Sequence, residues 1–291
     1  MKNTNQMFKI LCCIFALVLP ITTLASCDFL QRSNDEVSVD GTQGLKYEVG
    51  IGDTYMVSVG EATDEEEIVI SAQYDDMPVV LIKDGAFSES DVLKKVTVPE
   101  GIKQIGSMAF SNCPNLENVI LPQSIEFIGS YAFSKCGKIK SINLSNGVNN
   151  IEPSAFENCT GLESITVPQS ITAISSKTFR GCTGLKNVNL PDGLETIGNY
   201  SFASCTNLEK IIIPDNVTKI GEYAFQNCYK LKNVVISDSV ESIGDFAFDE
   251  CNSIEKVYYT GSAEKWAEIE IGSVNSCLRN AEIVYNYVPE E

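Results

Sequence analysis

The chain has 291 residues, of which 44% are hydrophobic, and this is enough for a sizeable core without help from disulfides. Its 39 acidic and 21 basic residues give a net charge of −18, which disfavours binding to nucleic-acid phosphates or to anionic lipid headgroups. The sequence contains no histidine, so Ser-His and Cys-His nucleophile relays are excluded and the commonest zinc ligand is missing.

Residues 1–26 have the features of an export signal. Lys2 and Lys9 precede an apolar run from Ile10 to Leu24. This run is shorter than the roughly 20 residues that a membrane-spanning helix needs. Removal of residues 1–26, which contain two lysines and no acid, changes the net charge from −18 to −20.

The end of this segment, Leu24-Ala25-Ser26-Cys27, resembles the lipobox of bacterial lipoproteins. The resemblance implies cleavage before Cys27, lipidation of Cys27, and a lipoprotein held to a membrane on the cell surface or in the periplasm. Ordinary signal cleavage beside an incidental cysteine is the alternative. Residues 27–44 are polar and predict a flexible tether.

A 23-residue unit then recurs eight times. Each unit carries a phenylalanine, a cysteine or serine three residues later, and a leucine or isoleucine six residues later. Two further aliphatic residues follow at alternate positions, usually with proline next. The phenylalanines are Phe87, Phe110, Phe133, Phe156, Phe179, Phe202, Phe225 and Phe248; the residues three later are Ser90, Cys113, Cys136, Cys159, Cys182, Cys205, Cys228 and Cys251.

A fixed period of this length predicts a solenoid, because one unit cannot bury its own apolar stripe whereas stacked units share a core. The alternating aliphatic residues predict a short strand, which proline ends. The Ile-Gly-x-x-Ala-Phe-x-x-Cys segment predicts a short helical or 3₁₀ turn on the opposite side.

These units resemble the BspA-like class of leucine-rich repeats found on bacterial surface proteins, and the resemblance covers residues 68–287. It implies an α/β-type solenoid: a right-handed superhelix with one short strand and one short helical or 3₁₀ turn per repeat, and a curved parallel sheet. The expected organisation is an N-terminal β cap with an atypical repeat at 45–85, regular repeats at 86–259, and a C-terminal cap at 260–291. In that cap, Ser262 is a candidate helix N-cap and Trp266 replaces a repeat isoleucine.

The seven repeat cysteines should form a line with about 4.8 Å between neighbours. A line cannot surround one metal ion, so no metal site is expected. Disulfides fit the spacing, but each thiol would have two equal neighbours and parallel Cβ vectors. We therefore expect small core side chains that hydrogen-bond a carbonyl group, with Ser90 in the same role. Cys277 lies outside the line and is the cysteine expected to be exposed.

The outward side chains of the strands form the candidate binding face. They include Ile120, Asn143, Thr166, Asn189, Ile212, Val235 and Tyr258, with Lys210 and Lys256 one or two positions away. Ile212, Val235 and Tyr258 predict an exposed apolar strip on a concave sheet. The alternative is that these residue types favour strands wherever they face.

No cluster of residues predicts catalysis. The acidic run Asp64–Glu67 lacks the ligand spacing of a calcium loop and predicts a solvated loop. No cofactor is expected. The sequence therefore favours a monomeric, non-enzymatic surface protein that binds an extracellular protein or mediates adhesion, does not bind nucleic acid, and meets the membrane only through lipid on Cys27. A glycan-binding or envelope-organising role is the alternative.

Overall fold

The structure is a computed structural model that describes residues 41–289. The chain divides into two units, Met1–Ser38 and Val39–Glu291, and the fold below belongs to the second. The expected export signal, Cys27 and most of the tether lie outside the described residues, so these remain predictions. Within residues 41–289, no helix has the length and apolarity needed to cross a membrane.

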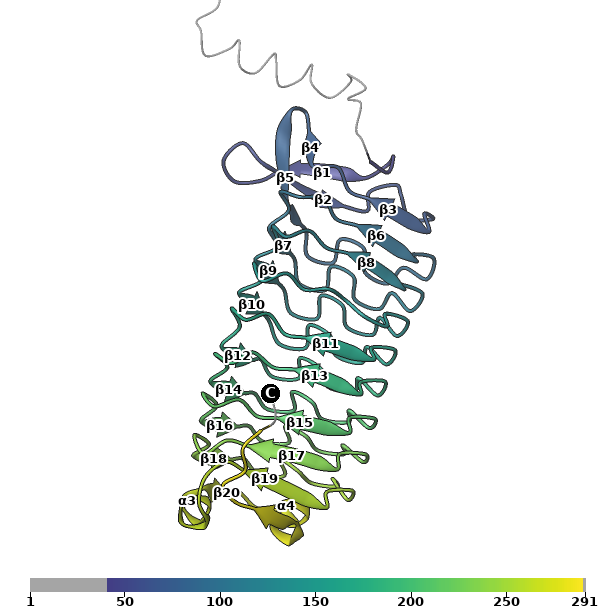
Figure 1. The fold of residues 1–291 in the computed structure, drawn as a ribbon. Coiled ribbons are helices and arrows are strands. Elements are labelled where there is room, and N and C mark those ends of the chain that lie inside the picture. Colours follow the sequence, from purple (N-terminus) through teal and green to yellow (C-terminus); the bar gives the residue numbers. More distant parts are fainter. Residues whose placement is uncertain (1–40, 290–291) are drawn as a thin grey trace, which may run out of the picture. The chain divides into compact units, whose positions relative to one another are not determined.

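The repeats form a solenoid with two rows of strands (Figure 1). The first row holds β3 (Glu67–Val69), β6 (Lys95–Thr97), β8 (Asn118–Ile120), β11 (Ser164–Thr166), β13 (Asn187–Asn189), β15 (Lys210–Ile212), β17 (Asn233–Ile236), β19 (Lys256–Tyr259) and β21 (Glu282–Val284). The second row holds β5 (Met77–Ile82), β7 (Gln104–Ile105), β9 (Phe127–Ile128), β10 (Asn150–Ile151), β12 (Ala173–Ile174), β14 (Thr196–Ile197), β16 (Lys219–Ile220), β18 (Ser242–Ile243) and β20 (Glu270–Ile271).

The paired strands within each row are parallel and one repeat apart, and within residues 41–289 pairing is missing between β13 and β15 in the first row and between β10 and β12 in the second. Lys95 pairs with Asn118 in the first row, and Gln104 pairs with Phe127 in the second. The predicted parallel-sheet solenoid is therefore confirmed. The second row was not predicted, although its short strands follow the two apolar positions that close each unit.

The third side of each coil, which we call the turn side, corrects the expected helical or 3₁₀ turn. It consists of consecutive turns, because backbone in the left-handed region interrupts any helix on both sides of the phenylalanine. Met108 has a φ of 57° and Asn112 a φ of 58°. Alternate amides bond to the next coil instead: Met108 N donates to Ser130 O and Phe110 N to Ala132 O, both at 2.8 Å. The turn side therefore stacks by hydrogen bonds between coils.

The eight repeat phenylalanines form a continuous stack inside the solenoid. Neighbouring ring centroids lie 5.0–5.6 Å apart, with interplanar angles of 3–17°. Seven of the rings are fully buried, and Phe87 at the N-terminal end is 2% exposed. This confirms that stacked units share one apolar interior.

Different elements close the two ends. At the N-terminal end, β1 (Lys46–Val49) pairs antiparallel with β2 (Tyr55–Ser58), and β4 (Gln73–Tyr74) pairs antiparallel with β5. At the C-terminal end lie helices α3 (Ala263–Glu268) and α4 (Ser276–Asn280). The Ser262 side chain accepts from Lys265 N, which confirms the predicted N-cap, and Trp266 packs edge-on against Tyr259 at 5.1 Å.

Candidate functional site

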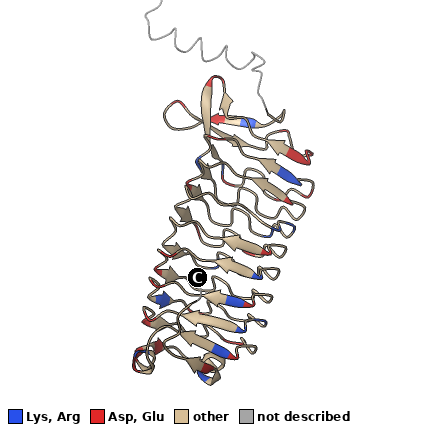
Figure 2. Ribbon diagram, in the orientation of Figure 1, with Lys and Arg blue, Asp and Glu red and all other residues tan. Residues whose placement is uncertain are grey.

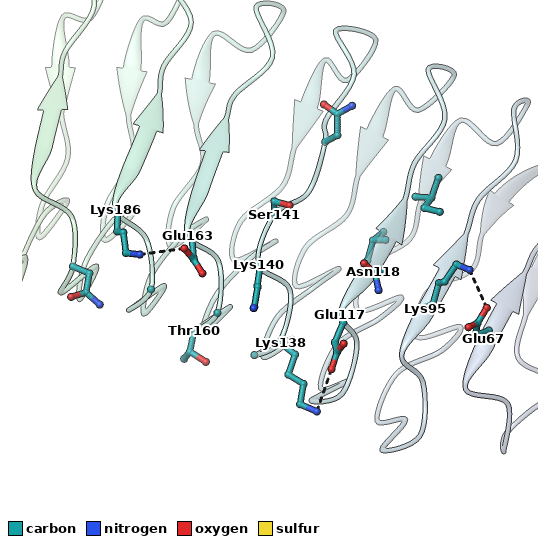
Figure 3. Close-up of a pocket in the computed structure, with 17 residues that line it drawn as sticks. Glu67, Lys95, Glu117, Asn118, Lys138, Lys140, Ser141, Thr160, Glu163 and Lys186 are labelled. Carbon is teal, nitrogen blue, oxygen red and sulfur yellow. Dashed lines mark hydrogen bonds and ion pairs between the residues drawn. The ribbon is translucent and has the colours of Figure 1, made fainter.

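An open groove of about 1270 Å³ lies over the first strand row, along the coils between Glu67 and Asn207 (Figure 3). Its lining is mostly polar and charged, and Val119 and Ile120 supply apolar surface. Three successive bends beside it contain glycine, namely Gly137, Gly161 and Gly184. A Cβ on Gly161 would lie 2.4 Å from Gly137 O, so this close approach of coils requires glycine.

Charges of alternating sign run along the edge of the groove. In nine successive coils, the residue that directly precedes the first-row strand, or its equivalent at 141–143, is alternately glutamate and lysine. We call these nine residues the charge ladder: Glu66, Lys94, Glu117, Lys140, Glu163, Lys186, Glu209, Lys232 and Glu255. Figure 2 shows both signs of charge along this row of strands. The ladder is therefore close to neutral, although the whole chain carries −18.

Some members of the charge ladder are paired and others, among them Lys140 and Lys232, form no ion pair within residues 41–289. Lys94 contacts Glu66 at 2.7 Å and Lys186 contacts Glu163 at 3.2 Å, whereas Glu117 pairs with Lys138 at 3.5 Å. Lys140 has no carboxylate within 4.0 Å among residues 41–289 and projects into the groove region (Figure 3). Exposed pairs of this kind contribute little to stability, so the ladder matters mainly as a surface.

The first strand row is interrupted at the groove. Residues 141–143, which correspond to a strand in every neighbouring coil, form none. In the described part of the chain, the backbone of Ser141–Leu144 neither donates nor accepts a backbone hydrogen bond. We call this stretch the seam. Its peptide groups keep hydrogen-bonding capacity that the regular coils use on one another.

The interruption follows the identity of one core residue, the second inward aliphatic residue of each unit. Where this residue is β-branched, its N–H bonds to the next coil at 2.9–3.0 Å, as in Ile70, Val98, Val167 and Ile213. Where it is leucine, that bond is missing from the described structure, as in Leu121, Leu144 and Leu190. Branching at Cβ favours extended backbone, and leucine lacks it. The interruption was not predicted, because the sequence interpretation did not distinguish β-branched from other aliphatic residues.

The seam also opens the core. Val119 is half-buried and lines the groove, whereas its counterparts Val96 and Ile165 are 0% and 3% exposed; Val188, beside the unpaired edge between β13 and β15, is also half-buried. Ile120 beside it is 50% exposed. The floor of the groove therefore offers apolar contact next to unbonded peptide groups.

The structure brings two of the predicted face residues, Ile120 and Asn143, into the groove. Thr166 and Asn189 lie on the same row outside it, where Asn189 Nδ2 donates to Thr166 Oγ1 at 3.3 Å. Ile212 is 43% exposed. Lys210 is exposed, and Lys256 pairs with Glu282 at 3.2 Å.

The predicted apolar strip is wrong at its C-terminal end. Val235 is 3% exposed, and Tyr258 is half-buried. Val235 lies beside Tyr258 in the sheet, and the Tyr258 ring packs on Tyr287 with centroids 4.7 Å apart. Tyr287 N donates to Tyr259 O, so the segment after β21 folds back over this part of the row. Ile212 is the member that stays exposed.

The seven repeat cysteines have the predicted packing role. All seven are fully buried, and each Sγ donates to a phenylalanine carbonyl of the preceding coil at 3.0–3.3 Å. Burial raises the pKa of Cys159 to about 12, which keeps it a thiol. Ser90 starts the line and accepts from Leu93 N. Cys277 is half-buried and donates to Asn252 Oδ1.

The chain belongs to the BspA type leucine rich repeat region family, which matches residues 72–186 and 149–277. Among solved structures, a leucine-rich repeat protein from Bacteroides ovatus ATCC 8483 is 26% identical over 87% of this chain and 72% of that chain, with a TM-score of 0.68. A leucine rich cell surface protein from Faecalibacterium prausnitzii A2-165 is 20% identical over 82% of this chain and 99% of that chain, with a TM-score of 0.46. Among curated proteins, none matches the chain.

Proposed function

We propose that this protein is a non-enzymatic recognition module that binds a protein outside the cell, or adheres to one, through the groove over the first strand row. The observation that supports this is the groove itself, which combines exposed apolar surface at Val119 and Ile120 with a nearly neutral charge ladder. Membership of a repeat family of bacterial surface proteins agrees with such a role. Binding across such a face needs no catalytic group.

Two matched variants test this proposal. Ile120 and Ile212 occupy equivalent exposed positions on β8 and β15, but only Ile120 lines the groove. Ile120→Asp should abolish binding to a panel of extracellular-matrix and cell-surface proteins measured by surface plasmon resonance. Ile212→Asp should leave that binding intact. Equal binding by both variants would remove the groove as the site.

Glycan binding is the second candidate, because amide and hydroxyl groups also line the groove. Asn118, Ser141, Asn143 and Thr160 present such groups there. They could bond to sugar hydroxyls, and the same chemistry suits a role in organising the cell envelope. A glycan array with no hit for the wild-type protein would refute the glycan reading and leave the protein-binding proposal standing.

The location of the protein belongs to the same proposal. Lipid on Cys27, after cleavage of residues 1–26, would hold the solenoid at a membrane on the cell surface or in the periplasm through the polar segment 27–44. The groove would then face ligands outside the cytoplasm. Metabolic labelling with a fatty acid, lost in Cys27→Ser, tests this anchor.

A further inference from the structure

We propose that the groove recognises an extended peptide segment whose backbone hydrogen-bonds to the peptide groups of the seam, Ser141–Leu144. This inference rests on the proposed function and names the ligand class of the same site. It predicts that two inward-facing leucines, the half-buried Leu121 and the buried Leu144, control ligand binding although neither lines the groove.

The first support is the hydrogen-bonding capacity of the seam. Strands such as β6 and β17 bond to both neighbours, and β13 and β15 each bond to one, whereas Ser141–Leu144 makes no such bond within residues 41–289. Ser141 and Asn143 line the groove, so this unpaired backbone lies at its floor. An extended peptide carries N–H and C=O groups at regular intervals of about 3.4 Å per residue, which matches such a row of donors and acceptors. A sugar chain offers no comparable row of amides.

The second support is the apolar surface beside the seam. Val119 is half-buried, as is Val188 on β13, whereas the equivalent Val96 and Ile165 are buried; Ile120 beside Val119 is half-exposed. Alternate side chains of an extended peptide point to opposite sides, so one side chain can cover this surface while the backbone bonds to the seam. The site thus combines backbone pairing, which gives affinity, with an apolar contact that gives selectivity.

The third support is the space and charge around the seam. Gly161 and Gly184 leave one position of their bends without a side chain, whereas Asn115, Lys138 and Lys230 occupy the equivalent position in other coils. Lys140 stands directly before the seam and has no acidic partner within 4.0 Å among the described residues. Its ammonium group can donate hydrogen bonds to an acidic side chain or to the C-terminal carboxylate of a peptide.

Leucine at positions 121 and 144 is what keeps the seam open. Every β-branched residue named above at this position bonds to the next coil, and each leucine does not. Exchange of leucine for isoleucine conserves volume and costs little packing energy in a core, usually under about 1.5 kcal/mol. It adds the Cβ branch that favours extended backbone. The double variant Leu121→Ile/Leu144→Ile should therefore complete the strand and close the seam.

The experiment compares the wild type, this double variant and a matched control, Leu190→Ile. Leu190 is also a leucine without the inter-coil bond, but it does not line the groove. The probe is an arrayed library of random linear peptides. We expect the best peptides to lose about tenfold or more in affinity for the double variant, since one or two hydrogen bonds are worth this much. The control should bind as the wild type does.

Hydrogen exchange checks the mechanism in the same samples. In the free wild type, the amides of Ser141–Leu144 should exchange fast, and a bound peptide should protect them. In the double variant they should be protected without peptide. Backbone N-methylation of the best peptide should weaken its binding to the wild type and serves as a test that needs no folded variant.

The outcomes separate this inference from the proposed function. If folded proteins bind and Ile120→Asp abolishes that binding, but no linear peptide binds, the inference fails and the proposed function stands. Equal peptide affinity for the wild type and the double variant also refutes the inference, as does peptide binding that leaves Ser141–Leu144 unprotected. If neither folded proteins nor peptides bind at the groove, both proposals fail.

Discussion

Replacement of Phe156 by alanine should destabilise the solenoid more than the same change at the end of the phenylalanine stack. Phe156 is fully buried, and its ring lies 5.4 Å from Phe133 and 5.6 Å from Phe179. Deleting a buried phenylalanine costs about 3–5 kcal/mol. Phe248 is equally buried, and among the rings of residues 41–289 it stacks on that of Phe225, at 5.0 Å, with none on its other side. Each stacked pair contributes about 0.5–1.5 kcal/mol beyond burial, so Phe248→Ala should cost about 1 kcal/mol less.

Urea unfolding followed by circular dichroism measures this difference. With a slope near 3 kcal/mol per molar urea, Phe156→Ala should lower the midpoint by about 1 to 2 M. The central position carries a further consequence, because the neighbouring seam already lacks inter-coil strand bonds. Loss of the ring there should uncouple the two halves and give a second transition. Phe156→Leu is the control and should keep one transition. The reasoning is refuted if Phe248→Ala is as destabilising as Phe156→Ala.

Four further predictions concern the thiols, the charge ladder, the N-terminal cap and the expected lipid anchor. In a protein comprising residues 28–291, Ellman's reagent at pH 8 should label one thiol, Cys277, in the native state and eight after unfolding, because the repeat thiols are buried. Rapid labelling of more than one native thiol contradicts this. Lys140→Glu should lower the melting temperature more in low salt than in high salt, since it places three carboxylates in adjacent coils. Lys140→Gln is the control. A decrease in melting temperature that does not depend on salt contradicts the electrostatic cause. Hydrogen bonds from two lysine ammonium groups lower the pKa of Glu48 from 4.5 to about 2. The Glu48 carboxylate therefore stabilises the N-terminal cap above pH 4.5, and this stabilisation is lost as the pH falls to about 2. Hydrogen exchange of the β1 amides should become faster over this pH range in the wild type and not in Glu48→Gln. Cys27→Ser should shift the protein from the detergent to the aqueous phase of Triton X-114, whereas Cys277→Ser should not; continued detergent partitioning contradicts lipidation.

The sequence was sufficient for the features that repeat. The 23-residue spacing predicted the solenoid, and the position of each cysteine three residues after phenylalanine predicted a buried thiol bonded to a carbonyl. Both depend on neighbours that the repeat itself places one coil away. Ser90, at the same position in the first unit, also indicated a small hydrogen-bonding side chain.

The turn side could not be read from spacing alone. Ala, Phe and Cys at adjacent and four-apart positions fit a helical turn as well as the turns that are present. Asparagine or glycine stands after the phenylalanine in several coils, as at Asn112, but the left-handed residues before it are of other types: Tyr131 and Lys177 adopt φ values of 57° and 60°. Hydrogen bonds between coils compensate for this backbone, and a single unit does not contain them.

The candidate site depended on departures from the repeat. Val235 was expected to be exposed because its own unit is regular, but Tyr287, more than two repeats further along the chain, packs over the neighbouring Tyr258. The seam was readable in principle, since Leu144 stands where Val98 stands in a regular coil. It was missed because an inward position was judged by hydrophobicity and not by branching.

In a solenoid of near-identical coils, a place where the repeat is locally broken differs chemically from the rest of the surface. Here the break removes strand pairing on the first row while the phenylalanine stack and the cysteine hydrogen bonds continue through the same coil: Phe133 and Phe156 stack at 5.4 Å, and Cys159 still bonds Phe133 O. The interior therefore carries the stability that the strand row gives up. Because the interior supplies this stability, the backbone of Ser141–Leu144 can stay unpaired at the surface while the coil remains folded. A leucine in place of a β-branched residue keeps the core hydrophobic but coincides with the missing strand bonds.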